Sequence, residues 1–277
     1  MLRLWPDQLG VALFPDRLVL ARASRRWWKR RLMHKEIISV ERAHPDAPPG
    51  QAALDALAGK VAAGTLTGAQ VTVVLSNSFV HYAVVPWSDA LGSEEEEMAL
   101  ARHCFVRVYD PEADGWILRL SAKAPGKTRL ACAVPPALID ALDKVMAPLG
   151  SRYCSLQPHL MASFNRWAAG LAEKPYWFAA AERGLLCLGL VSDGQWRSVR
   201  TIKVGPDWLN ELPAVLNREA CLVDSRFECD DVMLFSPEGA DTSTLDAGKW
   251  RITRLLPTLL PGMAAGIDAE YSIALGV

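Results

Sequence analysis

The sequence predicts an α/β protein built on an internally duplicated β-β-β-α-β unit. Three strand-like segments between residues 9 and 42 precede an amphipathic helical segment and the apolar strand VTVVLS at 71–76. The same order returns in the second half of the chain, where a meander at 176–204 precedes another helical segment and the apolar run DDVMLFS. A repeat of this size predicts two lobes with a cleft between them.

Each element of the first unit has its own signal. Pro15-Asp16 separates the alternating apolar runs LGVALF and RLVLARAS, which is typical of a hairpin, and LMHKEIISVER has strand character again. In GQAALDALAGKVAAG, Leu54, Leu57 and Val61 recur at helical spacing. VTVVLS is a continuous apolar run, which favours a buried parallel strand.

The second unit follows the same plan. YWFAAA, GLLCLGLVS and QWRSVRTIKV read as three strands, joined by turns at Glu182-Arg183-Gly184 and Asp193-Gly194. The helical segment GPDWLNELPAVLNREA places its large apolar residues on one face. The sequence therefore predicts a second lobe of the same construction.

A separate α+β module is predicted between the two units. SFVHYAVVPW is strand-like, the next helix begins with a capping box at Ser93 and Glu96, GWILRLSA and RLACAV form a hairpin pattern, and PPALIDALDKVMAPLG is an amphipathic helix. A helix at 156–171 would lead into the second unit. We thus predict a first lobe at 1–77 plus 151–172, an inserted module at 78–150 and a second lobe at 173–277.

Composition and short motifs exclude several functions. Charged residues make up 22% of the chain and the formal net charge is -1. The overall electrostatic field of the protein therefore does not favour binding of nucleic acid. We expect no metal site, because neither a C-x-x-C pair nor an H-E-x-x-H pattern occurs. The Gly126-Lys127-Thr128 sequence lies between two strand-like runs, so a turn is favoured over a phosphate-binding loop. No secretory signal or membrane span is evident, which predicts a cytosolic protein.

One concentrated basic patch stands out at residues 24–31. Its candidate contact residues are Arg26, Trp27, Trp28 and Arg30, since tryptophan and arginine together suit a membrane surface or an acidic partner. A nucleic-acid adaptor that uses the Arg25–Arg31 patch is a further alternative. The remaining alternative is that these residues lie at a solvent-exposed hairpin end and have no binding function.

Four segments resemble the actin-like ATPase superfamily, whose lobes have a ribonuclease H-like fold: LGVALFPDRLVLAR, VTVVLSNSFVHYAVVPW, SDGQWRSVRTIKVG and AEYSIALGV. Within it, the chain is similar to the pilus and secretion branch, which holds the PilM-like proteins of type IV pili, the MSHA-pilus homologue and the cytoplasmic domain of the type II secretion L protein. The resemblance spans the whole chain and rests on pattern rather than on invariant motifs.

The resemblance implies where a nucleotide would bind. In the family each meander carries an Asp-x-Gly turn that holds phosphate and metal, but here those positions are Ala12 and Phe14 in the first copy and Ala180 and Glu182 in the second. A family Gly-Gly turn falls near residues 236–239, where one glycine remains. We therefore expect no cofactor and a non-catalytic pseudo-ATPase. The alternative is an active ATP-binding protein of the same machinery.

The resemblance also implies a partner and a location. Such proteins bind a bitopic, N-like inner-membrane protein through its short cytosolic N-terminal peptide, in a groove beside the inserted module. Phe79, Tyr82 and Trp87 are the candidate contact residues in this sequence. The expected role is a cytoplasmic scaffold of a type IV pilus or type II secretion platform, peripheral at the inner membrane of a bacterium.

Overall fold

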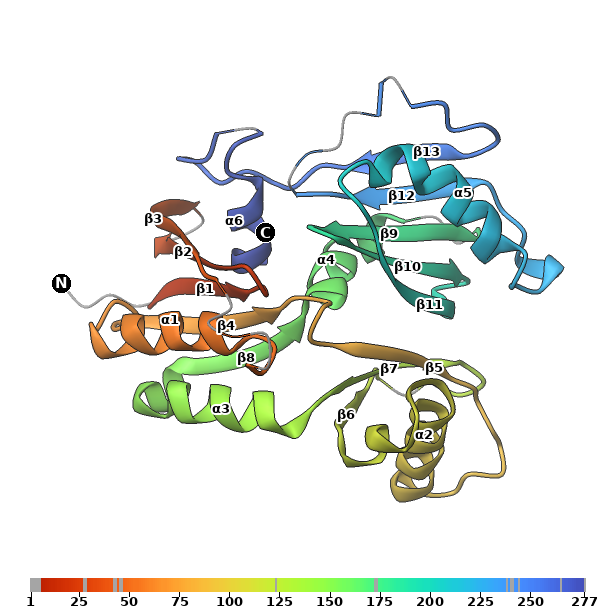
Figure 1. Ribbon diagram of the computed structural model, residues 1–277, viewed down its shortest axis with the longest axis horizontal. Coiled ribbons are helices and arrows are strands. Elements are labelled where there is room, and N and C mark those ends of the chain that lie inside the picture. The colour runs from red at the N-terminus through yellow and green to blue at the C-terminus, as the bar shows by residue number, and fades with distance from the viewer. Residues whose placement is uncertain are drawn as a thin grey trace.

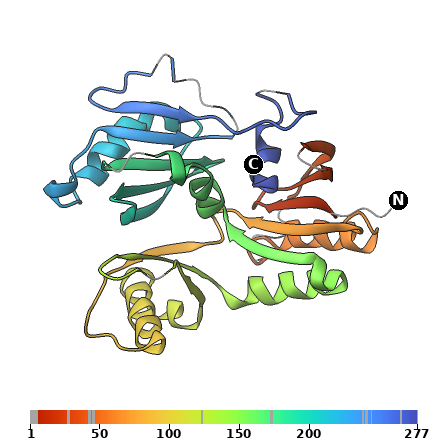
Figure 2. The same ribbon diagram turned by 180° about the vertical axis from the view of Figure 1, so that it is seen from behind.

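Two five-stranded sheets and a smaller third sheet make up the protein (Figures 1 and 2). The computed structural model describes residues 6–26, 29–41, 44, 47–122, 124–171, 174–237, 239, 242–243, 245–264 and 266–276. The two large sheets have strand orders β3-β2-β1-β4-β8 and β11-β10-β9-β12-β13. When the strands of each sheet are numbered in sequence order, both sheets have the same spatial order: third, second, first, fourth, fifth. The predicted duplication is therefore confirmed.

The first lobe is formed around the first meander. Its elements are β1 (Asp7–Leu13), β2 (Arg17–Arg26), β3 (Lys29–Ser39), α1 (Gln51–Ala62), β4 (Ala69–Leu75), β8 (Tyr153–Pro158) and α4 (His159–Trp167). β1 pairs antiparallel with β2 and parallel with β4, so VTVVLS is the buried parallel strand that its composition predicts. The predicted helix at 156–171 is wrong in its first turn, because residues 153–158 extend the sheet beside β4.

The second lobe repeats this plan. Its elements are β9 (Tyr176–Glu182), β10 (Leu185–Ser192), β11 (Gln195–Lys203), α5 (Trp208–Ala220), β12 (Asp231–Phe235) and β13 (Arg251–Leu255). Gly189 in β10 leaves room for a neighbour, since a Cβ there would lie 2.3 Å from the ring of Trp196. Burial along β9 and β10 is complete, which fits their unbroken apolar character.

The inserted module consists of a three-stranded sheet covered by a helix. Its elements are β5 (His81–Val85), α2 (Glu94–Tyr109), β6 (Ile117–Leu120) and β7 (Arg129–Val134), with sheet order β5-β7-β6. The Ser93 and Glu96 capping box forms as predicted. Gly126-Lys127-Thr128 lies in the β6–β7 connection, where Thr128 Oγ1 donates to the Trp196 carbonyl at 2.8 Å. This turn therefore attaches the module to the second lobe.

Two predicted domain boundaries need correction. Helix α3 (Pro136–Met146) packs on α1 and buries Leu142 and Met146 in the first lobe's core, so the module ends near residue 135 rather than 150. Helix α6 (Ala269–Leu275) packs on β1 and β2, so the chain returns to the first lobe at its end. Short 3-10 helices lie at Pro111–Gly115, Ala147–Arg152, Ala168–Gly170 and Ser225–Phe227.

Gly10 permits the docking of helix α6 on the sheet. A Cβ at this position in β1 would lie 1.9 Å from the carbonyl oxygen of Ala274, closer than any side chain allows. Polar contacts hold the helix as well, because Lys35 Nζ donates to both Asp268 oxygens at 2.6 and 2.7 Å. All seven residues of α6 are buried. In the described part of the chain, no helix is both long and apolar enough to cross a membrane.

Candidate functional site

The turns of the two meanders meet at the contact between the two lobes. The first turn, between β1 and β2, carries Asp16, and the second, between β9 and β10, carries Arg183. The Arg183 guanidinium lies 3.4 Å from Asp16 Oδ2 and 3.4 Å from Glu270 Oε1. Because Glu270 belongs to helix α6, three distant parts of the chain meet at this point.

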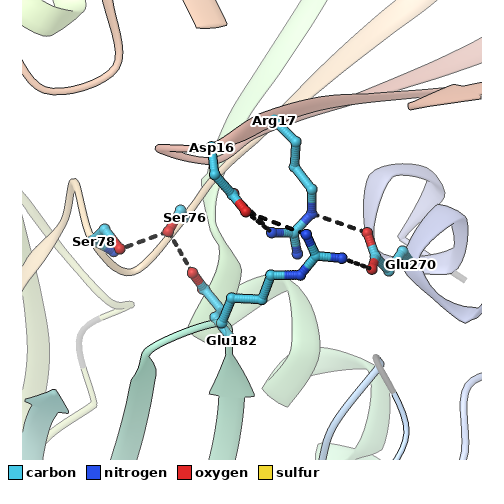
Figure 3. A network of polar contacts seen from close by, with 7 residues as sticks. Asp16, Arg17, Ser76, Ser78, Glu182 and Glu270 are labelled. Carbon is cyan, nitrogen blue, oxygen red and sulfur yellow. Dashed lines mark hydrogen bonds and ion pairs between the residues drawn. The ribbon is translucent and has the colours of Figure 1, made fainter. Parts of the chain in front are cut away.

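Arg17 fills the first-lobe side of this meeting point. Its side chain is almost fully buried, its Nε donates to Glu270 Oε2 at 3.0 Å, and one terminal nitrogen lies 2.8 Å from Asp16 Oδ1 (Figure 3). The guanidinium also lies 4.2 Å from the ring centroid of Phe14. A buried cation with two carboxylate partners and an aromatic face has its charge compensated inside the protein.

Glu182 fills the second-lobe side. It ends strand β9, and its carboxylate reaches across to the first lobe, where it accepts a hydrogen bond from the Ser76 hydroxyl (Figure 3). It also accepts one from the Asn77 backbone N–H at 2.9 Å. The same carboxylate contacts Nδ1 of His159, the first residue of helix α4. The Asn77 side chain continues the network, since its Oδ1 accepts from Tyr82 Oη at 2.6 Å and from Leu160 N at 2.9 Å.

The environment of Glu182 keeps its carboxylate ionised. Burial alone would raise the pKa, but the charge of His159 and the hydrogen bonds from His159, Asn77 and Ser76 outweigh it, so the pKa lies below its ordinary value. The fully buried His159 ring lies edge-on to Phe14 and Phe235, with both centroids 6.1 Å away. Since an ionised carboxylate only accepts, Nδ1 must carry the proton in this contact.

The four positions that the family resemblance assigns to phosphate motifs take part in packing and polar contacts in this structure. Ala12 and Ala180 are buried strand residues, Phe14 lies against Arg17, and Glu182 is the centre of the polar network. A carboxylate that receives a backbone N–H and a hydroxyl stands where the family resemblance places a phosphate group. These contacts connect the two lobes directly.

A cavity of about 470 Å³ lies beside this network, on its second-lobe side. The turn residues Glu182, Arg183 and Gly184 form one wall, Val204, Gly205, Pro206 and Trp208 form another, and Ser236 and Gly239 complete it. These include the single glycine that remains from the predicted adenosine-side turn; Glu238 lies outside the described residues. Glycine residues and Glu182 are thus both part of its lining.

The predicted partner residues divide into two groups. Phe79 is 4% exposed and Tyr82 is 2% exposed, so the prediction that they form part of an exposed partner surface is wrong. Phe79 packs beneath Gly50, and the Tyr82 hydroxyl belongs to the interlobe network. Trp87 is half-buried at the end of β5, where it lines a hollow with Pro86, Leu91 and Leu100. Apolar side chains in a strand are equally compatible with core and surface, which is why the sequence could not separate them.

The predicted basic contact residues also divide. Arg30 is half-buried and donates to Gln8 Oε1 and, at 3.4 Å, to the Leu275 carbonyl, so its prediction as a surface contact is wrong. The backbone of Arg26 pairs with Lys29 at the end of the hairpin. Trp27 and Trp28 lie outside the described residues.

Sequence reasoning missed several members of the interlobe network. Arg17, Asn77, His159 and Glu270 carry no motif, and they lie far apart in the chain. Glu182 is placed at a phosphate position by the family resemblance, but its role in this network was missed. The one signal of that role is a glutamate at the end of an otherwise apolar strand, next to a tight turn. Within the described residues, no cluster of histidine, cysteine and acidic side chains is arranged to hold a metal ion.

Structural comparison identifies the architecture, whereas no protein-family model and no curated protein matches the sequence. A PilM-PilN type IV pilus biogenesis complex contains a chain with a TM-score of 0.68 at 14% identity, covering 97% of this chain and 96% of that one. A Bacteroides thetaiotaomicron protein with an actin-like ATPase fold and unknown function gives 0.61 at 9% identity, with 99% and 98% covered. The chain has the actin-like fold.

The cytoplasmic domain of EpsL, an inner-membrane component of the type II secretion system of Vibrio cholerae, shares this actin-like fold. Its TM-score is 0.59 at 12% identity, and the match covers 98% of this chain and 95% of that chain. The predicted actin-like, two-lobed fold with an inserted module is therefore confirmed, and solved structures from the pilus and secretion branch are among its structural neighbours.

Proposed function

We propose that this protein is a non-catalytic actin-like scaffold of a type IV pilus or type II secretion-like platform at the cytoplasmic face of the inner membrane. The observation that carries the proposal is the interlobe network. Glu182 provides an internal anion that the first lobe binds through Ser76, Asn77 and His159. An actin-like protein with this network does not need a nucleotide phosphate to bring its two lobes together.

The structural neighbours of this fold support the assignment to a pilus or secretion platform. The solved structures that match over almost the full length include a pilus biogenesis complex and a secretion-system component. As the family resemblance implies, the partner would be a bitopic membrane protein that offers a short cytosolic peptide. The half-buried Trp87 and its neighbours in the module are the candidate contact surface.

The absence of nucleotide dependence can be tested by thermal unfolding. We expect no change in melting temperature when Mg-ATP or Mg-ADP is added, because the phosphate position is filled by Glu182 and the adjacent Arg183 is ion-paired. A ligand present at a hundred times its dissociation constant would add about 2.7 kcal/mol to the free energy of unfolding, which the measurement would detect.

A second candidate, ATP binding, has one observation in its favour. The glycine-lined cavity beside Glu182 has room for a planar group against Trp208. A concentration-dependent rise in melting temperature with Mg-ATP would establish this function. It would contradict the nucleotide-independent scaffold.

The partner surface predicts a specific loss of peptide binding. We expect Trp87→Ala to weaken binding of the partner's cytosolic N-terminal peptide about tenfold or more, because a large aromatic anchor in a hollow contributes at least 1 to 2 kcal/mol. Fluorescence anisotropy of the labelled peptide measures the change. The matched control is Val108→Ala, which removes an exposed apolar side chain from α2 of the same module. Equal affinities for both variants would exclude the Trp87 surface.

A further inference from the structure

Strand β6 forms an open edge of the module's sheet. The sheet order β5-β7-β6 gives β6 a single strand neighbour within the described residues, whereas β5 at the other edge packs against β11 of the second lobe. Helix α2 contacts one face of β6. Because an edge strand presents backbone groups that no neighbour uses, the outer side of β6 can receive an added strand.

The register with β7 shows which backbone groups of β6 point outward. The Ser121 N–H donates to the Leu130 carbonyl at 2.8 Å, so this antiparallel pair is a hydrogen-bonded one. Since hydrogen-bonded and non-hydrogen-bonded pairs alternate, Leu118 and Leu120 direct their N–H and C=O groups away from β7. The Arg119 guanidinium donates to the Leu118 carbonyl at 3.0 Å, a contact that the N–H of an added strand can replace.

The hollow that contains Trp87 lies at the end of the same strand. Leu120, the last residue of β6, lines it together with Trp87, Leu91 and Leu100. Leu100 belongs to α2, and Leu120 packs on the same cluster of buried residues between α2 and the sheet. Every second side chain of a strand added to β6 would point to this face. One apolar side chain of that strand can therefore enter the hollow.

A cation without an acidic partner lies at the rim of the hollow. Lys127 lines the hollow, is exposed, and forms no ion pair with another described residue. The other charged residues of the lining, Arg129 and Glu97, bind each other at 2.7 Å. Thr128 fixes the turn in place, because its N–H donates to Gln195 Oε1 of the second lobe at 3.1 Å. A carboxylate near the hollow would thus meet an uncompensated positive charge.

We propose that the partner's cytosolic peptide binds as an added strand on β6, with an apolar side chain in the Trp87 hollow and an acidic side chain at Lys127. The inference rests on the proposed scaffold function and specifies how the partner is held. Main-chain hydrogen bonds to Leu118 and Leu120 supply affinity, and the hollow and Lys127 supply specificity. A second copy of this chain fits less well, because a two-fold pairing of β6 edges brings two exposed Arg119 side chains together.

Hydrogen exchange followed by NMR on the full chain tests the strand addition. The probe is the peptide with the partner's cytosolic N-terminal sequence, as for the Trp87 variant. At saturating peptide, the amide protons of Leu118 and Leu120 should exchange at least about tenfold more slowly. The Arg119 amide already faces β7 and should change less. N-methylation of every second peptide residue should abolish binding, whereas N-methylation of the residues between them should not.

A charge-reversal variant tests the acidic contact. Lys127→Glu should weaken peptide binding about five- to tenfold, because repulsion replaces an exposed ion pair. The matched control is Lys144→Glu, which makes the same charge change at an exposed position on α3 and should bind as the wild type does. Equal losses for the two variants would show a general effect of net charge and would overturn the Lys127 contact.

The outcomes separate this inference from the proposed function. Peptide binding without protection of the Leu118 and Leu120 amides would overturn the strand addition and leave partner binding intact. Failure of the peptide to bind the wild type would contradict the proposed function itself. Protection of the two amides at high protein concentration without peptide would show that a second copy occupies the edge, and it would also overturn the proposal.

Discussion

Replacing Glu182 by alanine is expected to lower the free energy of unfolding by about 3 to 5 kcal/mol. The substitution leaves the buried His159 ring, the Asn77 backbone N–H and the Ser76 hydroxyl without the carboxylate that they share. Because those three groups belong to the first lobe and Glu182 belongs to the second, the loss also removes a direct connection between the lobes. Urea denaturation, followed by tryptophan fluorescence, measures the change.

The matched control is Glu211→Ala, which removes an exposed carboxylate from α5 in the same lobe. It should change stability by less than about 0.5 kcal/mol. Should the two variants unfold at the same urea concentration, the interlobe network would not be a determinant of stability. Glu182→Gln keeps the shape of the side chain and should fall between alanine and wild type.

The same network gives a pH dependence with a definite sign. The pKa of Glu182 is lowered in the folded protein from its ordinary value of 4.5, so its stabilising contribution is fully present above that value. The contribution is lost as the pH falls below 4.5 through the folded-state pKa. The difference in stability between wild type and Glu182→Gln should therefore shrink as the pH falls below 4.5. A difference that grows in acid would contradict the ionised carboxylate.

Replacing Gly10 by alanine is expected to destabilise the protein by about 1 to 3 kcal/mol or more. The new Cβ would lie 1.9 Å from the Ala274 carbonyl oxygen, so helix α6 must move away from β1. That movement would strain the contacts of Glu270 with Arg17 and of Asp268 with Lys35. Urea denaturation gives the loss, and limited proteolysis should show faster cleavage in the segment 256–268 before α6.

Gly59→Ala provides the control for Gly10. Gly59 lies inside helix α1, and no heavy atom lies within 4 Å of the position where its Cβ would be. Alanine there should stabilise the protein by about 0.5 to 1 kcal/mol, because glycine is unfavourable in a helix interior. If Gly10→Ala were equally well tolerated, α6 would not depend on close contact with β1.

The regular elements could be predicted because their signals are local. The alternating runs around Pro15-Asp16, the capping box at Ser93 and the apolar run VTVVLS each depend on neighbours within a few residues. Strand β8 was missed because residues 156–158 continue smoothly into helix α4, and their pairing with β4 is a long-range contact. Periodicity does not report which distant strand a segment will join.

The candidate site was predicted only in outline. The family resemblance assigns Ala12, Phe14 and Ala180 to phosphate motifs, and this assignment pointed to the two turns. What occupies the space between them was not predictable, since Arg17 and Glu270 are 253 positions apart in the chain. The partial burial of Trp87 and the full burial of Tyr82 likewise depend on how this segment packs on the core.

The sequence by itself determined the duplicated β-β-β-α-β plan and the inserted module, because both are patterns of nearby residue types. Only the tertiary structure decided that Glu182 is bound by the first lobe and that α3 and α6 belong to that lobe. These features depend on contacts between segments far apart in the chain, which form only when the two sheets and the C-terminal helix come together.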